Sequence, residues 1–457
     1  MRQKSSRVFF AFGVALVSLL MALAAVAADA FDEQRAPFRL ADRWTQSKLV
    51  DYTTLKARDP DYPDTFRSWD MICFGGPDNR LVFIPHEVSK GAGLTRYDRE
   101  TGRATVLLAG DNSGVFDADP KDGWDAMADD FGSLDPAVMT PAGTLLTGEE
   151  GYGRGRLFEL LNPLTATGRA DARWRWLSNI PSVAHEGIKF DRAGAMYFVD
   201  EDQSGSLYRF VPLTPGDYSR GQTFVLVAAD FAGDPAKDWH HAVRSGQGRT
   251  GAARWVALTD SVGRALTRAD PFDFRSRGGR AAADEVNGTP FGRPEDLEIG
   301  ALANGNQVLY VATTSENRVW SIELLGKHDV VIRVFVSSAQ TPDASGRPVG
   351  EGRDDRDYGL DDPDNLAMGA DGRLYIVEDE DPGDIWQALD ADRDGVAESV
   401  SLIATLGPFG AEPTGLIQDP EDADAFVVAV QHPRSGNDAL WYLRRAPPRP
   451  MTGKEGE

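Results

Sequence analysis

The stretch Ala195-Met-Tyr-Phe-Val-Asp-Glu-Asp202 decides the fold, because an apolar, β-rich run ends there abruptly in three carboxylates. The same pattern occurs seven times, at intervals of about 57 residues on average, which fits the blades of a β-propeller whose equivalent strands converge on one channel. We therefore predict an all-β protein, a β-propeller with six or seven blades around a central channel. The other runs are 81–85 before His86-Glu87, 144–147 before Glu149-Glu150, 255–259 before Asp260, 308–314 before Glu316-Asn317, 373–377 before Glu378-Asp379-Glu380-Asp381, and 425–430 before Gln431-His432.

Long connections rich in Gly, Pro and Asp separate the runs, notably residues 111–130, 264–292 and 338–361. Loops of this length in a compact domain are more often functional than idle, so we expect them to lie over the channel mouth. The repeat predicts one propeller domain over residues 66–443, because a ring of blades cannot be divided. Residues 28–65 are an extended lead-in, and the proline-rich tail 444–457 is expected to be disordered.

The first 27 residues have the pattern of a secretory signal peptide. Three basic residues precede an apolar stretch, and Ala25-Val26-Ala27 offers a small-residue cleavage site. The alternative is a retained membrane anchor, because the apolar stretch is close to the lower length limit for a spanning helix. We expect cleavage, a periplasmic or secreted location, and no membrane association of the mature protein.

The chain is strongly acidic, with a formal net charge of −23, and cleavage after Ala27 would make it −26. Nucleic acid is excluded as a natural partner, because phosphate backbones bind basic surfaces. The single cysteine, Cys73, cannot form an internal disulfide. If equivalent strands all end in carboxylates at the same mouth, they form an acidic ring there, and such oxygen donors favour calcium, magnesium, manganese or iron over zinc.

Several longer segments resemble the PhoX-type alkaline phosphatases when taken in order. They are Pro85-His-Glu87, Gly93-Leu-Thr-Arg-Tyr-Asp98, Thr140-Pro-Ala-Gly-Thr-Leu-Leu-Thr-Gly-Glu-Glu150, His185-Glu186-Gly with Tyr197-Phe-Val-Asp-Glu-Asp202, Gly292-Arg-Pro-Glu-Asp296, Asp362-Pro-Asp-Asn-Leu366 with Leu374-Tyr-Ile-Val-Glu-Asp379, and Glu412-Pro-Thr-Gly415 with Gln431-His-Pro433. The resemblance extends from about Asp70 to Pro433.

The resemblance implies a propeller that carries calcium and iron at its channel mouth and hydrolyses phosphomonoesters through a metal-bound oxo or hydroxide. Arg293 would bind the substrate phosphate, because its planar fork matches two phosphate oxygens. The implied partner is a small phosphoester, and we expect a monomer. The implied metal ligands are Glu149, Glu150, Glu186, Glu295 and Asp364, with Asn365 and Glu378 beside them.

One departure from the family pattern concerns iron. The family has a cysteine ligand just upstream of the Thr-Pro-x-Gly-Thr segment, whereas residues 131–139 contain no cysteine and only one carboxylate, Asp135. If Asp135 has taken over this position, the site should prefer a hard cation. We therefore expect calcium, and the sequence leaves iron and catalysis open.

Two other classes of propeller remain as alternatives. One is a lactonase or a quinone-dependent sugar oxidase, and the other is a non-catalytic propeller that uses calcium only as a staple. A separate hairpin, Asp390-Ala-Asp-Arg-Asp-Gly395 followed by Glu398, is either a calcium loop or an acidic turn.

Overall fold

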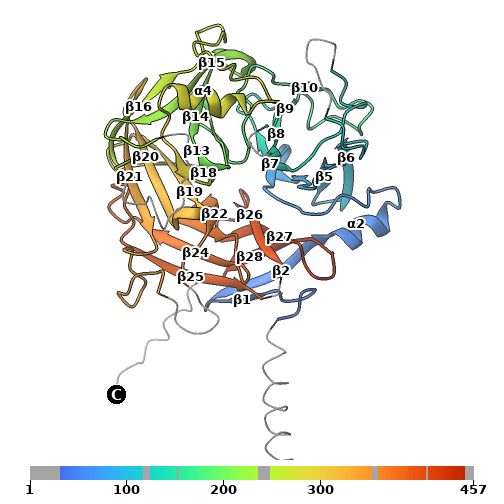
Figure 1. Cartoon of the computed structure of the whole chain (residues 1–457). Helices are drawn as coiled ribbons and strands as arrows, with labels where there is room; N and C mark the ends of the chain where they lie inside the picture. The colour runs from blue at the N-terminus through green and yellow to red at the C-terminus, as the bar shows by residue number, and fades with distance from the viewer. Residues whose placement is uncertain are drawn as a thin grey trace, which may run out of the picture.

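The computed structural model describes residues 31–116, 124–151, 154–234, 248–351, 359–407 and 410–447. The predicted signal peptide, 1–27, lies outside these ranges, as does nearly all of the predicted tail. Among the described residues, no helix is long and apolar enough to span a membrane. The strands are arranged around a central axis as antiparallel sheets, which confirms the predicted all-β, propeller-like class (Figure 1).

Four of the sheets are separate blades. Each is an up-and-down meander whose strands alternate in direction, with its first strand innermost. The blades are β3 (Cys73–Gly75), β4 (Leu81–Pro85), β5 (Gly93–Asp98) and β6 (Arg103–Ala109); β7 (Leu134–Met139), β8 (Leu145–Glu149), β9 (Leu157–Leu160) and β10 (Trp174–Trp176); β22 (Pro363–Met368), β23 (Leu374–Glu378), β24 (Asp384–Leu389) and β25 (Ser399–Leu406); and β26 (Glu412–Gln418), β27 (Ala425–Gln431) and β28 (Ala439–Arg445).

A nine-stranded sheet fills the rest of the ring. It contains two four-stranded units joined by β16 (Gly251–Ala257), which pairs with β15 on one side and with β21 on the other. The units are β11 (Ile188–Phe190), β12 (Met196–Val199), β14 (Leu207–Thr214) and β15 (Asp217–Ala228), and β18 (Pro294–Ala301), β19 (Gln307–Thr313), β20 (Arg318–Leu324) and β21 (Asp329–Ser337). Their inner strands β11 and β18 contact each other, so this sheet is nearly closed.

The predicted count of six or seven separate blades is wrong. Hydrogen bonding gives four separate blades and one continuous sheet, because β16 fuses two four-stranded units. Six of the seven apolar runs are the second strands of four-stranded units, whereas the run around Trp255 is the bridging strand. That run has the same local pattern as the others, and the sequence does not reveal that its partners belong to two units.

The N-terminal segment closes the ring. Strand β1 (Phe38–Leu40) pairs with β25, and β2 (Trp44–Asp51) pairs with β28 along its whole length, so the segment expected as a lead-in completes two C-terminal blades (Figure 1). Helix α2 (Tyr52–Arg58) follows and is capped by Asp51, whose side chain accepts a hydrogen bond from Thr54 N. Strand β28 ends at Arg445, two residues into the predicted tail.

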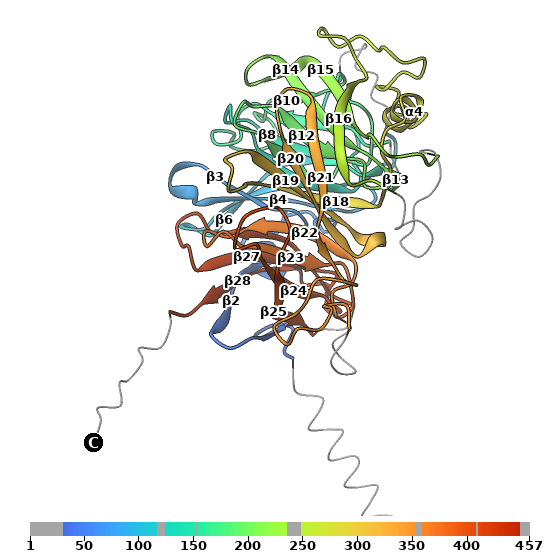
Figure 2. The ribbon, with the colours of Figure 1, turned by 90° about the vertical axis from the view of Figure 1, so that its left-hand side faces the viewer.

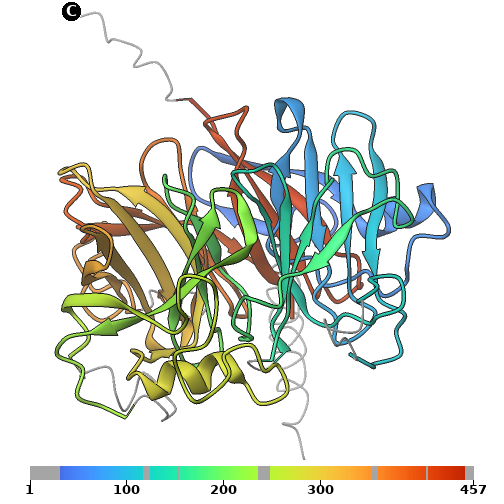
Figure 3. The same cartoon turned by 90° about the horizontal axis from the view of Figure 1, so that it is seen from above.

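The remaining elements are short. Strand β13 (Gln203–Gly205) pairs with β17 (Phe291–Gly292) in a two-stranded sheet. Helix α4 (Gly278–Glu285) lies on the same side of the ring as β13 in Figure 2, and Figure 3 shows it as the yellow helix beside the ends of the strands. Two short 3-10 turns, η1 (Pro77–Asn79) and η4 (Thr314–Glu316), complete the elements. Fully buried Trp386 and Trp441 belong to apolar clusters that join neighbouring sheets, and Trp320 belongs to a cluster formed mainly within the nine-stranded sheet.

Candidate active site

The innermost strands bring six carboxylates to one end of the channel, one from the start of each strand. They line a cavity of about 170 Å³ together with carboxylates that follow the second strands. In an antiparallel pair the start of the first strand faces the end of the second, so both sets meet at the same mouth. The first set is Asp70, Asp135, Glu186, Glu295, Asp364 and Glu412, and the second is Glu87, Glu150, Glu201 and Asp379.

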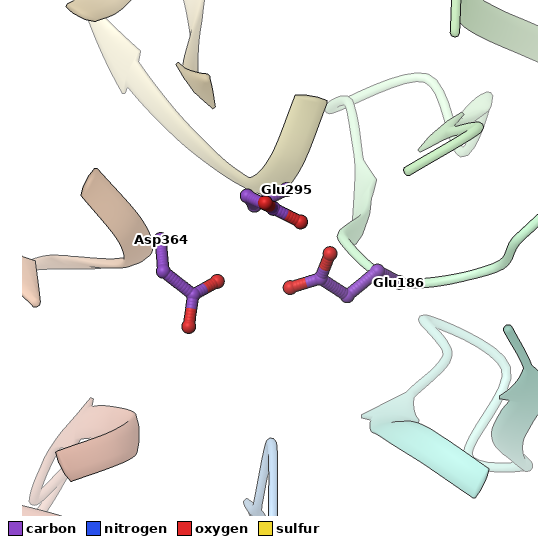
Figure 4. Close-up of side chains that lie close together, drawn as sticks. All are labelled: Glu186, Glu295 and Asp364. Atoms are coloured by element: carbon purple, nitrogen blue, oxygen red, sulfur yellow. The ribbon is translucent and has the colours of Figure 1, made fainter. Parts of the chain in front are cut away.

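Three of these carboxylates form a compact group. Glu186, Glu295 and Asp364 each offer an oxygen, and these oxygens lie within 4.8 Å of one another. Figure 4 shows the three carboxyl groups directed at a common point from three different segments. All three side chains are buried. Burial is the main cause that raises the pKa of Glu186 and Asp364 well above the ordinary value, and neighbouring carboxylates add to it. Burial also raises the pKa of Glu295, although Arg293 acts to lower it.

Two carboxyl oxygens in the cavity have no hydrogen-bond partner among the described residues. They are Glu186 Oε2 and Asp135 Oδ1, in side chains that are 4% and 2% exposed. An unpaired buried polar atom is costly, and crowded carboxylates either protonate or bind a cation. The donors are all hard oxygens, so the arrangement fits calcium or another hard cation. Asp135, left open by the sequence, therefore faces the cavity, and burial and Asp70 raise its pKa.

Arg293 is the only guanidinium among the residues that line the acidic cavity. It stands between β17 and β18 with a positive φ of 56°, and donates from Nε to Glu201 Oε1 at 3.0 Å and from Nη1 to Asp379 Oδ2 at 3.2 Å. Its Nε also lies 3.2 Å from Glu295 Oε1. The nearby carboxylates, led by Glu295, raise its pKa. The cation therefore sits at the edge of the cavity with 37% of its side chain exposed.

Three residues predicted as metal ligands or their neighbours do not line the acidic cavity. Glu149 accepts hydrogen bonds from Arg156 at 2.7 and 2.8 Å, in a buried ion pair. Asn365 accepts from Thr414 Oγ1 at 2.7 Å and donates to Asp364 Oδ1 at 3.1 Å. Glu378 accepts from the indole of Trp386 at 2.7 Å. Glu150, Glu186, Glu295, Asp364 and Arg293 line the same cavity, and their roles in binding metal and phosphate stay predictions.

Several lining residues were not predicted as site residues. They are Asp70, Glu87, Glu201, Asp379, Glu412, Gln431 and His432. A signal for part of this set exists in the sequence, because a carboxylate stands 15 residues before another at Asp135/Glu150, Glu186/Glu201 and Asp364/Asp379. Fifteen residues is the length of the hairpin from the start of an inner strand to the end of the second strand that pairs with it.

A second, larger cavity of about 820 Å³ adjoins the acidic one and shares four lining residues with it, Glu87, Glu150, Glu201 and Arg293. Its wall also carries Phe116, Phe274, Arg154 and Arg275. Two of the predicted mouth loops, 111–130 and 264–292, contribute to this wall.

Two features outside these cavities bear on metal binding. Cys73 is buried in β3, and burial raises the pKa of its thiol to about 12, so it is no thiolate ligand. At the predicted hairpin, Asp390, Asp392 and Glu398 offer oxygens within 4.8 Å of one another, but only Asp390 is partly buried. The choice between a calcium loop and an acidic turn stays a prediction.

The comparisons with known proteins agree with this architecture. The family model "Alkaline phosphatase PhoX" matches residues 177–434. The structure of Pseudomonas fluorescens PhoX in complex with vanadate, a transition state analogue, is similar over 89% of this chain and 96% of that chain, with 14% identity and a TM-score of 0.58.

More distant matches include a streptogramin B lyase (11% identity, 88% of this chain and 97% of that chain, TM-score 0.40). Another is the PQQ-bound aldose sugar dehydrogenase of Streptomyces coelicolor (12% identity, 89% and 99%, TM-score 0.40). No curated protein sequence matches. Since the family model covers more than half of the chain, the protein belongs to the PhoX alkaline phosphatase family.

Proposed function

We propose that the protein is an exported, metal-dependent phosphomonoesterase that works at the acidic cavity. The observation that carries the proposal is the juxtaposition of a buried group of three carboxylates with one guanidinium at the cavity edge. The carboxylates suit cations, and the guanidinium suits a phosphate oxygen pair. Neither feature alone would distinguish a phosphatase from a calcium-stapled propeller.

Calcium is the cation that these donors suit best. Glu186, Glu295 and Asp364 would hold one ion, and Asp135 with Glu150 and Asp70 would supply oxygens for another. Bound cations would lower the pKa of a water nucleophile and stabilise the leaving oxygen, which removes the need for a serine or cysteine nucleophile. Whether iron also binds is left to metal analysis, since no cysteine lines the cavity among the described residues.

The side chains of this chain would act mainly by orientation. Arg293 already donates to carboxylates on two sides, and a phosphate monoester offers the same kind of paired oxygen acceptors. Asn365 holds Asp364 by its amide and is itself held by Thr414, so the Asp364 carboxylate keeps a defined direction. Thr414 Oγ1 also contacts Asp70 Oδ1, so its single proton is shared between the Asn365 and Asp70 acceptors. A single hydroxyl therefore ties the carboxylates of two blades together.

Phosphate release from model monoesters, with and without a chelator, tests the proposal on the same preparation used for metal analysis. Release that depends on calcium supports it. Lactone cleavage without phosphate release would move the protein to the lactonase class. Metal-dependent stability without either activity would favour a non-catalytic binding propeller in which calcium only stabilises the fold.

A further inference from the structure

The larger cavity is lined by three arginines that the acidic cavity beside it lacks, Arg154, Arg156 and Arg275. Arg154 and Arg275 line it, and both side chains are exposed. Within the parts of the chain that the structure describes, neither guanidinium has a carboxylate partner at ion-pair distance, although the protein has a net charge of −23. In a strongly acidic protein, two guanidinium groups in one cavity without a carboxylate partner among the described residues are unusual, and they suit an anionic ligand group.

Three of the five acidic residues on this wall have arginine partners, and the other two, Glu87 and Glu150, are shared with the acidic cavity. Arg156 pairs with Glu149 at 2.7 Å, and Arg293 pairs with Glu201 at 2.9 Å. Asp202 is paired with Arg280 at 3.4 Å. Away from the carboxylates shared with the acidic cavity, the uncompensated charge in the larger cavity is therefore positive.

Aromatic rings stand beside these cations. Phe274 lies next to Arg275, whose guanidinium carbon is 5.4 Å from the ring centroid, and its ring meets Trp176 edge-on at 5.6 Å. Phe116 is 38% exposed although its ring is large and apolar. Exposed rings on the wall of a cavity suit a flat apolar ligand group.

We propose that the larger cavity binds the alcohol part of the substrate and selects phosphomonoesters whose alcohol bears an aromatic ring and a second anionic group. The inference rests on the proposed function, because the shared residues place such an alcohol beside Arg293 and the acidic cavity. The volume of about 820 Å³ is far more than a phosphate group needs and lies within the range of pockets for sizeable organic ligands.

The test compares two phosphonates that differ only in the second charge, phenylphosphonate and 4-(carboxymethyl)phenylphosphonate, by calorimetric titration of the calcium-loaded protein. We expect the charged compound to bind more tightly. Arg154→Gln and Arg275→Gln should each reduce this preference by roughly two- to fivefold, the range for exposed ion pairs, because each lowers the affinity for the charged compound more than the affinity for phenylphosphonate. Arg154→Glu should reduce it further, and added salt should weaken it.

Arg254→Gln is the matched control, because Arg254 is an exposed arginine on β16 that does not line the cavity and its loss changes the net charge equally. Equal affinity of the two phosphonates for the wild-type protein, or a preference that survives both cavity substitutions, would overturn the inference. Phosphate release from phenyl phosphate is measured separately. Discriminating binding without any phosphate release would reject the phosphatase proposal and keep the ligand class.

Discussion

Replacing Glu186 by Gln should change the stability of the protein in opposite directions with and without calcium. Glu186 lies in the group of three buried carboxylates whose oxygens are within 4.8 Å of one another. In chelated protein, the ionised carboxylate of Glu186 repels Glu295 and Asp364. With calcium present, the same carboxylate is a ligand. The substitution keeps the size of the side chain and removes only its charge.

The magnitude follows from these distances. At an effective dielectric constant of about 20, two ionised carboxylates about 4.8 Å apart repel by about 3.5 kcal/mol. Protonation of one group relieves part of this repulsion, so we expect the chelated variant to gain about 1 to 3 kcal/mol. An unfolding entropy of about 2.1 cal/mol/K per residue over about 400 residues means that 1 kcal/mol shifts the melting temperature by about 1.2 °C.

Calcium should reverse the order. An ion that binds only the folded protein adds about 4.1 kcal/mol, or about 5 °C, when its concentration is a thousandfold above its dissociation constant, which exceeds the roughly 1 to 3 kcal/mol that the variant gains in chelator. Wild-type protein should gain at least this much, while the Glu186→Gln variant should lose most of the gain because one of three carboxylates is missing.

Scanning calorimetry at about pH 8, in chelator and in calcium, measures both signs on the same samples. Glu421→Gln is the control, because Glu421 is exposed and its contact with Asn79 needs only an oxygen acceptor, which an amide retains. Melting curves of the wild type that coincide with and without calcium would refute the cation site. A variant that is less stable in both media would show that Glu186 acts through packing and not through charge.

The other predictions use the same cavity and its wall. Arg293→Lys should lower kcat/KM for phosphate esters by about 10- to 100-fold through loss of the two-point fork, with a much smaller change in melting temperature; equal damage to both would contradict the role. Asp135→Ala should remove one metal equivalent together with activity, and unchanged metal content would show that Asp135 is no ligand. The pKa values of Glu186 and Asp364 are raised by folding, so the chelated wild type should lose stability as the pH rises above the ordinary values of about 4 to 4.5. A melting temperature that rises with pH above this point would contradict the prediction. Arg156→Gln should destabilise the fold by about 3–5 kcal/mol, measured by urea unfolding, because Glu149 and Asp129 would stay buried without their partner.

The sequence located the acidic ends of the strands but could not decide which member of each acidic pair faces the channel. Successive side chains on a strand point to opposite faces. Glu150 therefore lines the cavity while Glu149 turns toward Arg156, and Asp379 lines it while Glu378 turns toward Trp386.

The resemblance implied a metal-binding role for both Glu149 and Glu150, and at the other pair it implied one for Glu378 but none for Asp379, which is the residue that lines the cavity. The decision between them depends on partners that only folding brings close. Arg156 is seven residues beyond Glu149 and Trp386 is eight beyond Glu378, each across a turn between two strands.

The carboxylates at the start of the inner strands were harder to predict, because they lie at or near loops, where acidic residues are common. Asp70 and Glu412 come from opposite ends of the chain, and β26 meets the segment before β3 only where the ring closes. There the position of a Cβ on Gly415 would be 2.7 Å from the carbonyl oxygen of Asp70, so this residue must be glycine, and its φ of 57° agrees. No local pattern predicts that contact.

Two of the six four-stranded units place no second-strand carboxylate in the cavity: after β27 the lining residues are Gln431 and His432, and the break after β19 accounts for the position of Arg293. After β19, the equivalent of the second-strand carboxylates is Glu316, but its side chain is buried against Arg249, with Nη1 to Oε1 at 2.7 Å, and accepts from Gly292 N at 2.6 Å. Glu316 is thereby withdrawn from the cavity, and the residue after Gly292 is Arg293, which enters the space with its backbone in the left-handed region. A ring of carboxylates alone would bind cations and repel phosphate. With the guanidinium of Arg293 in place of a carboxylate at the β18–β21 unit, an anion can bind at the edge of the cavity beside cations. The proposed phosphatase chemistry requires this arrangement.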